Sequence, residues 1–362
     1  MKGRVKRVFS NLTEQVDAIL LMNGEDPAVD VSFFYATGLE SGLFEGCVAI
    51  LRPDGETVVL SSALEETIAR SGSSEVRIFR KNAERDEMMA QELKGISRIG
   101  INGDSLTVRN LDVIRKSVPN AEVVDVAKAI ERTRLVKDDR EVESIREACR
   151  IASEIADQIP SFLRVGMTEY EAAAEINYRM QKLGASSPSF ETISSYGKNS
   201  AEPHHTPDGT VLRAGDFALF DFGAKLRRYC SDITRTFVAG RPTARQLEMY
   251  ETVLEAQQVG LGSIRHGASG KEVDAAARAV ISRSESKGTM PHSLGHGLGL
   301  SVHDGGRMAP EIDLTLEENM VLTVEPGMYV SGYGGVRIED VVRVRRGGCE
   351  LLTSAKKDLV VV

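Results

Sequence analysis

The chain has 362 residues, of which 41% are apolar and 27% are charged, and its formal net charge is −8. This balance predicts a folded protein with room for two domains and excludes intrinsic disorder. The acidic charge gives no electrostatic reason to expect nucleic acid or an anionic membrane as a partner. No apolar run approaches the roughly 20 residues of a membrane-spanning helix, and the start MKGRVKRVF lacks a signal peptide's apolar core, so we expect a cytoplasmic protein.

Strand-like and helical runs alternate over residues 1–125, which predicts an N-terminal α/β domain. The strand-like runs are 18–23, 46–53, 57–62, 76–79, 98–102 and 121–126, and the helical runs lie near 62–72, 84–94 and 107–117. The domain contains no histidine and no glycine-rich turn between a strand and a helix. We therefore find no nucleotide site in it.

From residue 126 the pattern changes to longer amphipathic helices. Apolar residues at helical spacing on a charged background predict a linker, 126–137, and then a long helix that begins a second domain, 138–362. Another helix is expected near 168–183, where TEYE has the pattern of a capping box, and two more near 243–264 and 270–286.

Between and after these helices, two strand pairs each contain two acidic residues. Asp221 ends the run FALFDFGA and Asp232 lies in YCSDITRTFVAG, so a hairpin turning through 225–228 would bring both carboxylates onto neighbouring strands. Glu325 closes NMVLTVEP and Glu339 lies in VRIEDVVRV, again as two antiparallel strands. Each pair can thus present two carboxylates from one rigid sheet.

These four carboxylates, together with His296 in GHGLG, predict a site for two divalent metal ions. Taken singly, each residue is more often a surface acid or an interior histidine. Burying four unpaired carboxylates in these apolar segments would cost several kcal/mol for each group. Two cations held between them would offset this cost. Two metal ions about 3.5–4 Å apart that share carboxylates and a water generate hydroxide at neutral pH. The pattern therefore predicts a metallohydrolase, and the ligand types suit manganese, cobalt, iron or zinc.

The other histidines and the cysteines carry weaker signals. We expect structural roles for His205, His266 and His292. The four cysteines, Cys47, Cys149, Cys230 and Cys349, are widely separated, which argues against a disulfide framework and a thiolate zinc site. For Cys230 we expect a packing role.

The ordered segments DFGA, SDITRT, HSLGHGLGL, VEPGMY and GVRIED resemble the M24 metallopeptidases, which have the pita-bread fold. Within that family they resemble the branch of Xaa-Pro dipeptidases (prolidases) and aminopeptidase P, and the resemblance spans most of 138–345. The N-terminal half resembles that branch's extra domain in length and strand–helix alternation. The implied fold is an α/β two-domain protein: a creatinase/prolidase N-terminal-like, ribonuclease-H-like domain followed by an α+β pita-bread metallopeptidase domain.

The resemblance assigns each metal ligand a role. It implies that Asp221 chelates one ion, that Asp232 and Glu339 bridge both ions, and that His296 and Glu325 hold the other. All five ligands are present, whereas inactive relatives such as creatinase and scaffold-type members have lost some or all of them. The resemblance therefore favours an active hydrolase.

The resemblance also implies substrate contacts. His204 and His303 occupy the positions of two active-site histidines, and Phe190 occupies that of an aromatic wall of the proline pocket. Val302 corresponds to the apolar residue beside the second histidine. Arg307 corresponds to an arginine that binds the terminal carboxylate of a dipeptide, for which a guanidinium fork is well suited.

The expected reaction is hydrolysis of the Xaa-Pro bond of dipeptides by a water that two metal ions activate. Glu325 is the candidate proton shuttle, His204 and His303 are the other catalytic candidates, and Arg337 is expected to orient a metal ligand without touching substrate. The alternatives are an aminopeptidase P, which acts on longer Xaa-Pro peptides, and a non-enzymatic scaffold on the same fold. Relatives are commonly dimers, so a homodimer is expected.

Overall fold

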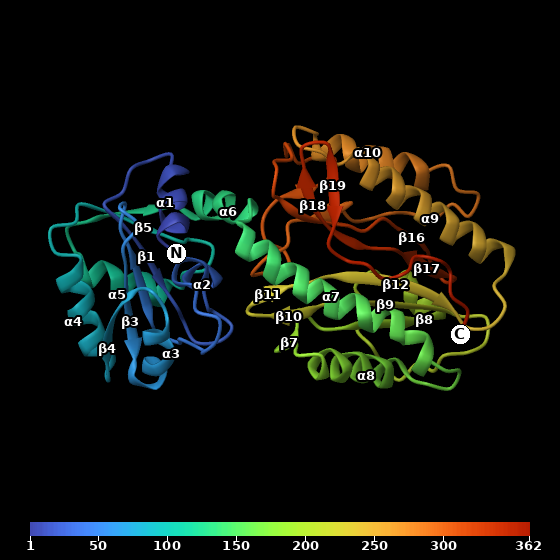
Figure 1. Ribbon diagram of the computed structural model, residues 1–362, viewed down its shortest axis with the longest axis horizontal. Helices are drawn as coiled ribbons and strands as arrows, with labels where there is room; N and C mark the ends of the chain where they lie inside the picture. Colours follow the sequence, from blue (N-terminus) through green and yellow to red (C-terminus); the bar gives the residue numbers. More distant parts are fainter. The chain divides into compact units, whose positions relative to one another are not determined.

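The computed structural model describes residues 1–362 and divides into two compact units, Met1–Arg134 and Leu135–Val362 (Figure 1). None of its helices combines the length and the apolar composition that crossing a membrane would require.

The first unit is built on one six-stranded mixed sheet with the strand order β4-β3-β2-β1-β5-β6. Its strands are β1 (Ala18–Met22), β2 (Val48–Leu51), β3 (Thr57–Ser62), β4 (Glu75–Phe79), β5 (Arg98–Ile101) and β6 (Glu122–Asp125). Its helices are α1 (Lys2–Ser10), α2 (Val31–Thr37), the 3-10 turn η1 (Ala63–Glu65), α3 (Glu66–Ser71), α4 (Asn82–Glu92), α5 (Val108–Ser117) and α6 (Ala127–Leu135). The six predicted strands and three predicted helices are confirmed, and α6 occupies the segment expected as a linker.

Besides α6, two further helices of this unit were not predicted. Helix α2 has the sequence VSFFYAT, which is rich in aromatic residues and poor in strong helix formers. The side chain of Asp30 caps its start, Gly38 ends it in the left-handed conformation, and Phe33 and Phe34 are buried. Tertiary packing therefore stabilises α2 against its weak local propensity. Helix α1 buries Val5 and Val8. The sequence pattern does not predict this helix, because its short apolar stripe is interrupted by basic residues.

The second unit places short strands between two pairs of helices (Figure 1). Its helices are α7 (Asp139–Phe162), α8 (Glu169–Lys182), the 3-10 turn η2 (Gly197–Ala201), α9 (Ala244–Ser263) and α10 (Gly270–Ile281). Its strands are β7 (Ser187–Pro188), β8 (Ile193–Tyr196), β9 (Phe217–Phe222), β10 (Ala224–Leu226), β11 (Tyr229–Cys230), β12 (Ile233–Val238), β13 (Gly295–His296), β14 (Arg307–Met308), β15 (Val321–Val324), β16 (Gly327–Val330), β17 (Gly334–Arg337), β18 (Asp340–Arg345) and β19 (Gly348–Leu351).

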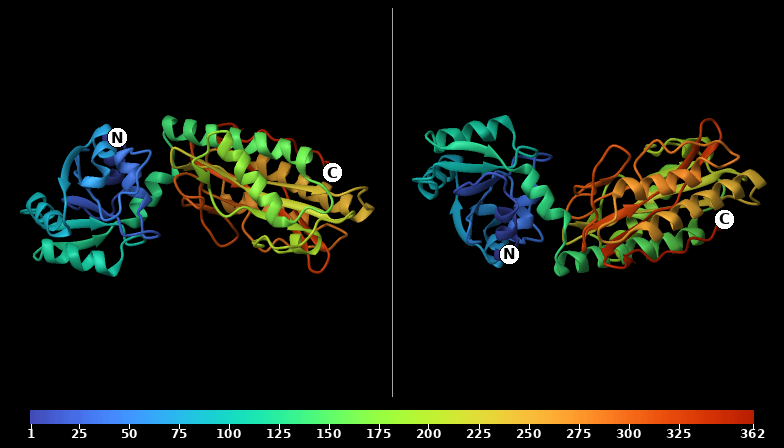
Figure 2. Two further views of the ribbon diagram at one scale, coloured as in Figure 1. Left: turned by 90° about the horizontal axis from the view of Figure 1, so that it is seen from below. Right: turned by 90° about the horizontal axis from the view of Figure 1, so that it is seen from above.

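Two hydrophobic cores hold this unit together. One core joins α7 and α8 to β8, β9 and β12, and the other joins α9 and α10 to β15–β18. Figure 2 shows α9 and α10 (orange) lying side by side. The capping box predicted at Thr168 and Glu171 is present at the start of α8. Helix α10 ends at Ile281, five residues before the predicted end, because the polar, glycine-containing sequence that follows has no apolar stripe to bury.

The predicted hairpins form, but each is interrupted near its acidic residues. Strand β9 pairs with β12, and the ribbon continues as β10 and β11 to a two-residue turn in which Arg227 and Arg228 have positive φ. Asp232 lies in the break between β11 and β12, so the prediction that it lies within a regular strand is wrong. Glu325 lies between β15 and β16, and Glu339 lies between β17 and β18. These three carboxylates thus occupy points where the strand pairing changes.

Candidate active site

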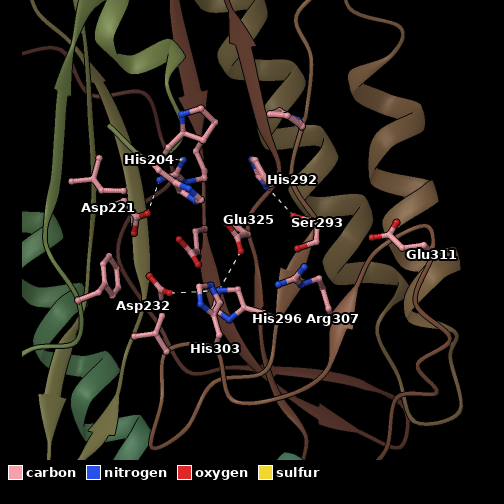
Figure 3. A pocket seen from close by; sticks show the side chains of 17 residues that line it. His204, Asp221, Asp232, His292, Ser293, His296, His303, Arg307, Glu311 and Glu325 are labelled. Carbon is pink, nitrogen blue, oxygen red and sulfur yellow. Dashed lines mark hydrogen bonds and ion pairs between the residues drawn. The ribbon is translucent and has the colours of Figure 1, made fainter. Parts of the chain in front are cut away.

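One pocket of the second unit brings together every residue that the sequence predicts for the site (Figure 3). Its volume is about 470 Å³, which suits a small ligand. The predicted residues that line it are Phe190, His204, Asp221, Asp232, His296, Val302, His303, Arg307, Glu325, Arg337 and Glu339. The residues that line it and were not predicted are Ile193, Pro203, Pro291, His292, Ser293 and Glu311.

The candidate metal ligands converge on one side of this pocket. The Nε2 atom of His296 lies 3.4 Å from Oε1 of Glu325 and 3.8 Å from Oδ2 of Asp232. Asp232, His296 and Glu339 each offer one ligand atom, and these atoms lie within 4.8 Å of one another. Figure 3 shows that Asp232, His296 and Glu325 point toward the same space. Groups spaced in this way can share a cation.

Two of these carboxylates have one oxygen held by a protein donor and one left without a partner. Nη2 of Arg337 donates to Oδ2 of Asp221 at 2.5 Å, and the Thr234 hydroxyl donates to Oε2 of Glu339 at 2.7 Å. The other oxygens, Asp221 Oδ1 and Glu339 Oε1, are buried without a hydrogen-bond partner, as is Asp232 Oδ1. Leaving such charged groups unsatisfied is costly. The donor set therefore fits divalent cations.

The pKa values of the carboxyl groups reflect the same crowding. Burial raises the pKa of Asp232 and of Glu339 well above the usual range, and the neighbouring carboxylates raise both further. Burial raises the pKa of Glu325 to about 8, with Arg337 opposing the shift and Asp221 adding to it. Without cations the site would take up protons, because so many anions cannot share a buried space.

His296 is oriented as a metal ligand would be. Its Nδ1 atom lies 3.1 Å from the carbonyl oxygen of Gly297, which can only accept, so Nδ1 carries the proton and Nε2 keeps its lone pair. Burial, with a smaller contribution from His303, lowers the pKa of His296 to about 3, so the ring is neutral. A side chain at Gly295 would lie 1.9 Å from the Thr323 carbonyl oxygen, which explains the glycine beside this ligand.

The proposed substrate residues lie beside the ligands. The rings of His303 and His296 meet edge to face, with centroids 4.3 Å apart. Burial and the charge of Arg307 lower the pKa of His303, so this ring is neutral near pH 7. Arg307 pairs with His296 in the β13–β14 register and is exposed, and its guanidinium makes no ion pair within the protein.

His292 is a pocket residue that sequence reasoning assigned to structure. Its Nδ1 lies 2.9 Å from the Ser293 carbonyl oxygen and its Nε2 lies 2.9 Å from the Tyr329 hydroxyl, to which Nη1 of Arg337 also donates. Burial, followed by the charge of Arg337, lowers the pKa of His292 to about 4. Its position four residues before His296 is a sequence feature that could have placed it in the pocket.

The other two histidines assigned to structure lie away from the pocket lining. His205 pairs with Glu169, and His266 accepts a hydrogen bond from the backbone N–H of Glu318. The cysteines are free, as predicted, and Cys230 is buried.

Comparisons with known families cover nearly the whole chain. Residues 143–346 match Metallopeptidase family M24, and residues 4–136 match the Creatinase/Prolidase N-terminal domain. The chain is 34% identical to the Xaa-Pro dipeptidase of Pyrococcus horikoshii over 363 residues, which cover 99% of both chains.

Solved structures of the same family have the same fold over nearly the whole chain. The Xaa-Pro dipeptidase from Bacillus anthracis is 33% identical, with a TM-score of 0.91 over 99% of each chain. The X-Pro aminopeptidase from Thermotoga maritima is 31% identical, with a TM-score of 0.91 over 99% of this chain and 100% of that one. These similarities confirm the predicted two-domain pita-bread architecture. The chain belongs to metallopeptidase family M24 and carries a creatinase/prolidase N-terminal domain.

Proposed function

We propose that the protein is an Xaa-Pro dipeptidase that hydrolyses the bond before a C-terminal proline. The observation that carries this proposal is Arg307, an exposed guanidinium without a protein partner in the pocket that holds the candidate metal ligands. A guanidinium can donate two parallel hydrogen bonds to the terminal carboxylate of a short substrate. The similarity to the Xaa-Pro dipeptidases of Pyrococcus horikoshii and Bacillus anthracis supports the same substrate class.

Two divalent ions, manganese, cobalt, zinc or iron, fit the proposed ligands. Asp221 would chelate one ion, Asp232 and Glu339 would bridge both, and His296 with Glu325 would hold the other. The unpartnered buried oxygens of three of these carboxylates support the assignment. When bound, such ions lower the pKa of a water molecule and polarise a carbonyl group.

The chain's own groups would handle protons and orientation. Glu325 is the proposed proton shuttle, since its carboxyl group lies in the ligand cluster beside His296. His303 and His204 would donate hydrogen bonds to the scissile carbonyl oxygen, and a neutral ring at His303 still offers one N–H for this purpose. Arg337 would keep Asp221 oriented through the bond to Oδ2.

The apolar side of the pocket would receive the proline ring. Phe190, Ile193 and Val302 line it and offer hydrocarbon surface to a ring that has no N–H to donate. A tertiary Xaa-Pro amide lacks the donor that general peptidases bind, so a dedicated apolar wall is useful. Arg307 would then bind the substrate's terminal carboxylate at a fixed distance from this apolar wall.

The second candidate is an aminopeptidase P activity on longer peptides, which the similarity to the Thermotoga maritima X-Pro aminopeptidase favours. A non-enzymatic scaffold is the third reading, and the retained ligand set argues against it. Hydrolysis rates for Xaa-Pro, Xaa-Pro-Yaa and longer peptides, each with manganese, cobalt and zinc, separate the three. Faster cleavage of the tripeptide than of the dipeptide would overturn the dipeptidase proposal, and no cleavage of any peptide would favour the scaffold.

The homodimer and the cytoplasmic location inferred from the resemblance stay predictions. Light scattering of the purified protein and fractionation of the source cells would test them.

A further inference from the structure

The segment that carries His204 is held from both ends by one buried carboxylate. Oε1 of Glu169 accepts from the backbone N–H of Tyr196 at 2.7 Å and from the side-chain amide of Asn199 at 3.1 Å. Oε2 of Glu169 accepts from the backbone N–H of Asp208 at 3.0 Å and lies 2.8 Å from Nε2 of His205. Glu169 is fully buried, although it begins helix α8 far from this segment in sequence.

The contact with Glu169 favours the protonated, charged form of His205. The His205 side chain is 9% exposed, and its Nδ1 lies 3.3 Å from a carboxylate oxygen of Glu202. Burial alone lowers the pKa of His205, but the hydrogen bond and charge of Glu169 outweigh it, and the net pKa is raised. The His205 side chain thus ties the backbone directly after His204 to the buried acid of α8.

Further bonds tie the same segment to the start of α8. The backbone N–H of Glu169 donates to the Thr210 carbonyl oxygen at 3.0 Å, and that of Tyr170 donates to the Asp208 carbonyl oxygen at 3.4 Å. The first turn of a helix has unpaired N–H groups and a positive partial charge, which stabilise an acidic residue there. The backbone at the start of α8 and the side chain of its first residue, Glu169, therefore hold segment 197–210 together; we call this contact the anchor.

The same atoms could suggest a metal site, since Glu169, His205 and Asp208 offer ligand atoms within 4.8 Å of one another. The two oxygens of Glu169 already accept from the four donors described above, so their bonding capacity is used. Hydrogen bonding accounts for the cluster without an ion.

We propose that Glu169 is a positioning residue, which holds segment 197–210 through His205 so that the neighbouring His204 side chain faces the pocket. His204 lines the pocket (Figure 3). His205, the next residue, turns instead to the buried acid Glu169. The benefit to catalysis rests on the proposed function, in which His204 contacts the substrate. The anchoring itself does not depend on it.

A double-mutant cycle tests the effect on catalysis. Glu169→Gln keeps the size of the side chain but removes its charge, and it should lower kcat/KM by between roughly tenfold and a hundredfold, as expected for a misplaced group. In a His204→Ala background the same change should cost almost nothing further, since the group being positioned is gone. The matched control is Glu175→Gln, a partly exposed acid of α8 paired with Arg179, which should behave like the wild type. Equal losses from Glu169→Gln in both backgrounds would overturn the proposal.

Hydrogen–deuterium exchange tests the anchoring without any activity measurement. Glu169→Gln should speed exchange of peptides within 197–210 and leave the metal content unchanged, and Glu175→Gln should do neither. Unchanged exchange over 197–210 would overturn the anchor even if the enzyme proved to be a dipeptidase. If no Xaa-Pro peptide were cleaved, the proposed function would fail, and the exchange result would still decide on the anchor.

His205→Gln provides a second variant in case Glu169→Gln does not fold. It keeps a donor beside Glu169 but removes the positive charge, so it should show a smaller increase in exchange over the same peptides. Its loss of activity should also vanish in the His204→Ala background. A loss that persists there would contradict the positioning role.

Discussion

Arg337 and Asp221 form the most direct contact between a cation of the protein and a candidate metal ligand. Nη2 of Arg337 donates to Oδ2 of Asp221 at 2.5 Å, and Oδ1 of Asp221 remains buried without a partner. Nε of Arg337 also donates to the Thr234 hydroxyl, which in turn donates to Glu339. One guanidinium therefore orients two ligands that lie on different strand pairs.

This contact predicts that Arg337→Met weakens metal binding by about tenfold to a hundredfold, the usual cost of losing an outer-shell partner. Competition with a coloured chelator would measure the affinity, and elemental analysis would give the metal content. Arg346→Met is the matched control, because Arg346 is exposed and pairs with Glu318 on the surface. An unchanged metal affinity in Arg337→Met would contradict the role of Arg337 in orienting the ligands.

The stabilisation that metal gives should depend on pH. In the metal-free protein, the pKa values of Asp232, Glu325 and Glu339 lie above their ordinary values. A raised pKa contributes stability that is complete below the unfolded value of about 4 and is lost as the pH rises through the folded value. Metal binding has the opposite dependence, because the ligands must be deprotonated. The increase in Tm on adding manganese should therefore grow between about pH 5 and pH 8.

Differential scanning fluorimetry at several pH values, with manganese or with a chelator, measures this increase. Asp232→Asn removes one of the crowded charges, so it should stabilise the metal-free form near pH 8 and also weaken metal binding. Asp232→Ala should release both ions, because this residue is expected to bridge them. A Tm increase that is independent of pH, or two ions retained by Asp232→Ala, would contradict the assignment.

Arg307→Ala should reduce the preference for dipeptides. The variant loses a charge-assisted contact worth roughly 1.5–3 kcal/mol, or about tenfold to a hundredfold in affinity, with Xaa-Pro substrates. A tripeptide carries its carboxylate one residue farther along and should lose less. Steady-state kinetics on both substrates measure the change, and Arg307→Lys, which keeps the charge but not the fork, should retain part of the preference. An equal loss on both substrates would point to a structural role and reopen the aminopeptidase P reading.

The His205–Glu169 pair should stabilise the fold most in mildly acidic solution. The pKa of folded His205 is raised above its ordinary value of 6.5. The contribution is therefore complete below 6.5 and is lost as the pH rises through the raised value. The difference in unfolding free energy between the wild type and His205→Gln should shrink as the pH rises from about 6 to 9. Denaturant unfolding measures it, with His266→Gln as the control; a difference that does not vary with pH would contradict the ion pair.

The local sequence was sufficient to predict those helices and strands whose signals lie within a few neighbouring residues. The capping box at Thr168 and the strand runs around Asp221 and Glu325 are short-range patterns, because capping and alternation depend on neighbours in the chain. Four charged residues in otherwise apolar runs also pointed to one shared site, since burying them separately would be too costly. All the residues predicted for the site line one pocket.

Tertiary structure decided what depends on distant contacts. Glu169 contacts His205, and His292 contacts Tyr329, and in each pair the two residues are far apart in sequence. Helix α2 forms because Phe33 and Phe34 are buried, against its local preference. By itself the sequence determined which residue types were available for the chemistry. Packing and the breaks in strand pairing decided where the side chains point, because hydrogen bonds and burial are shared between segments that meet only after folding.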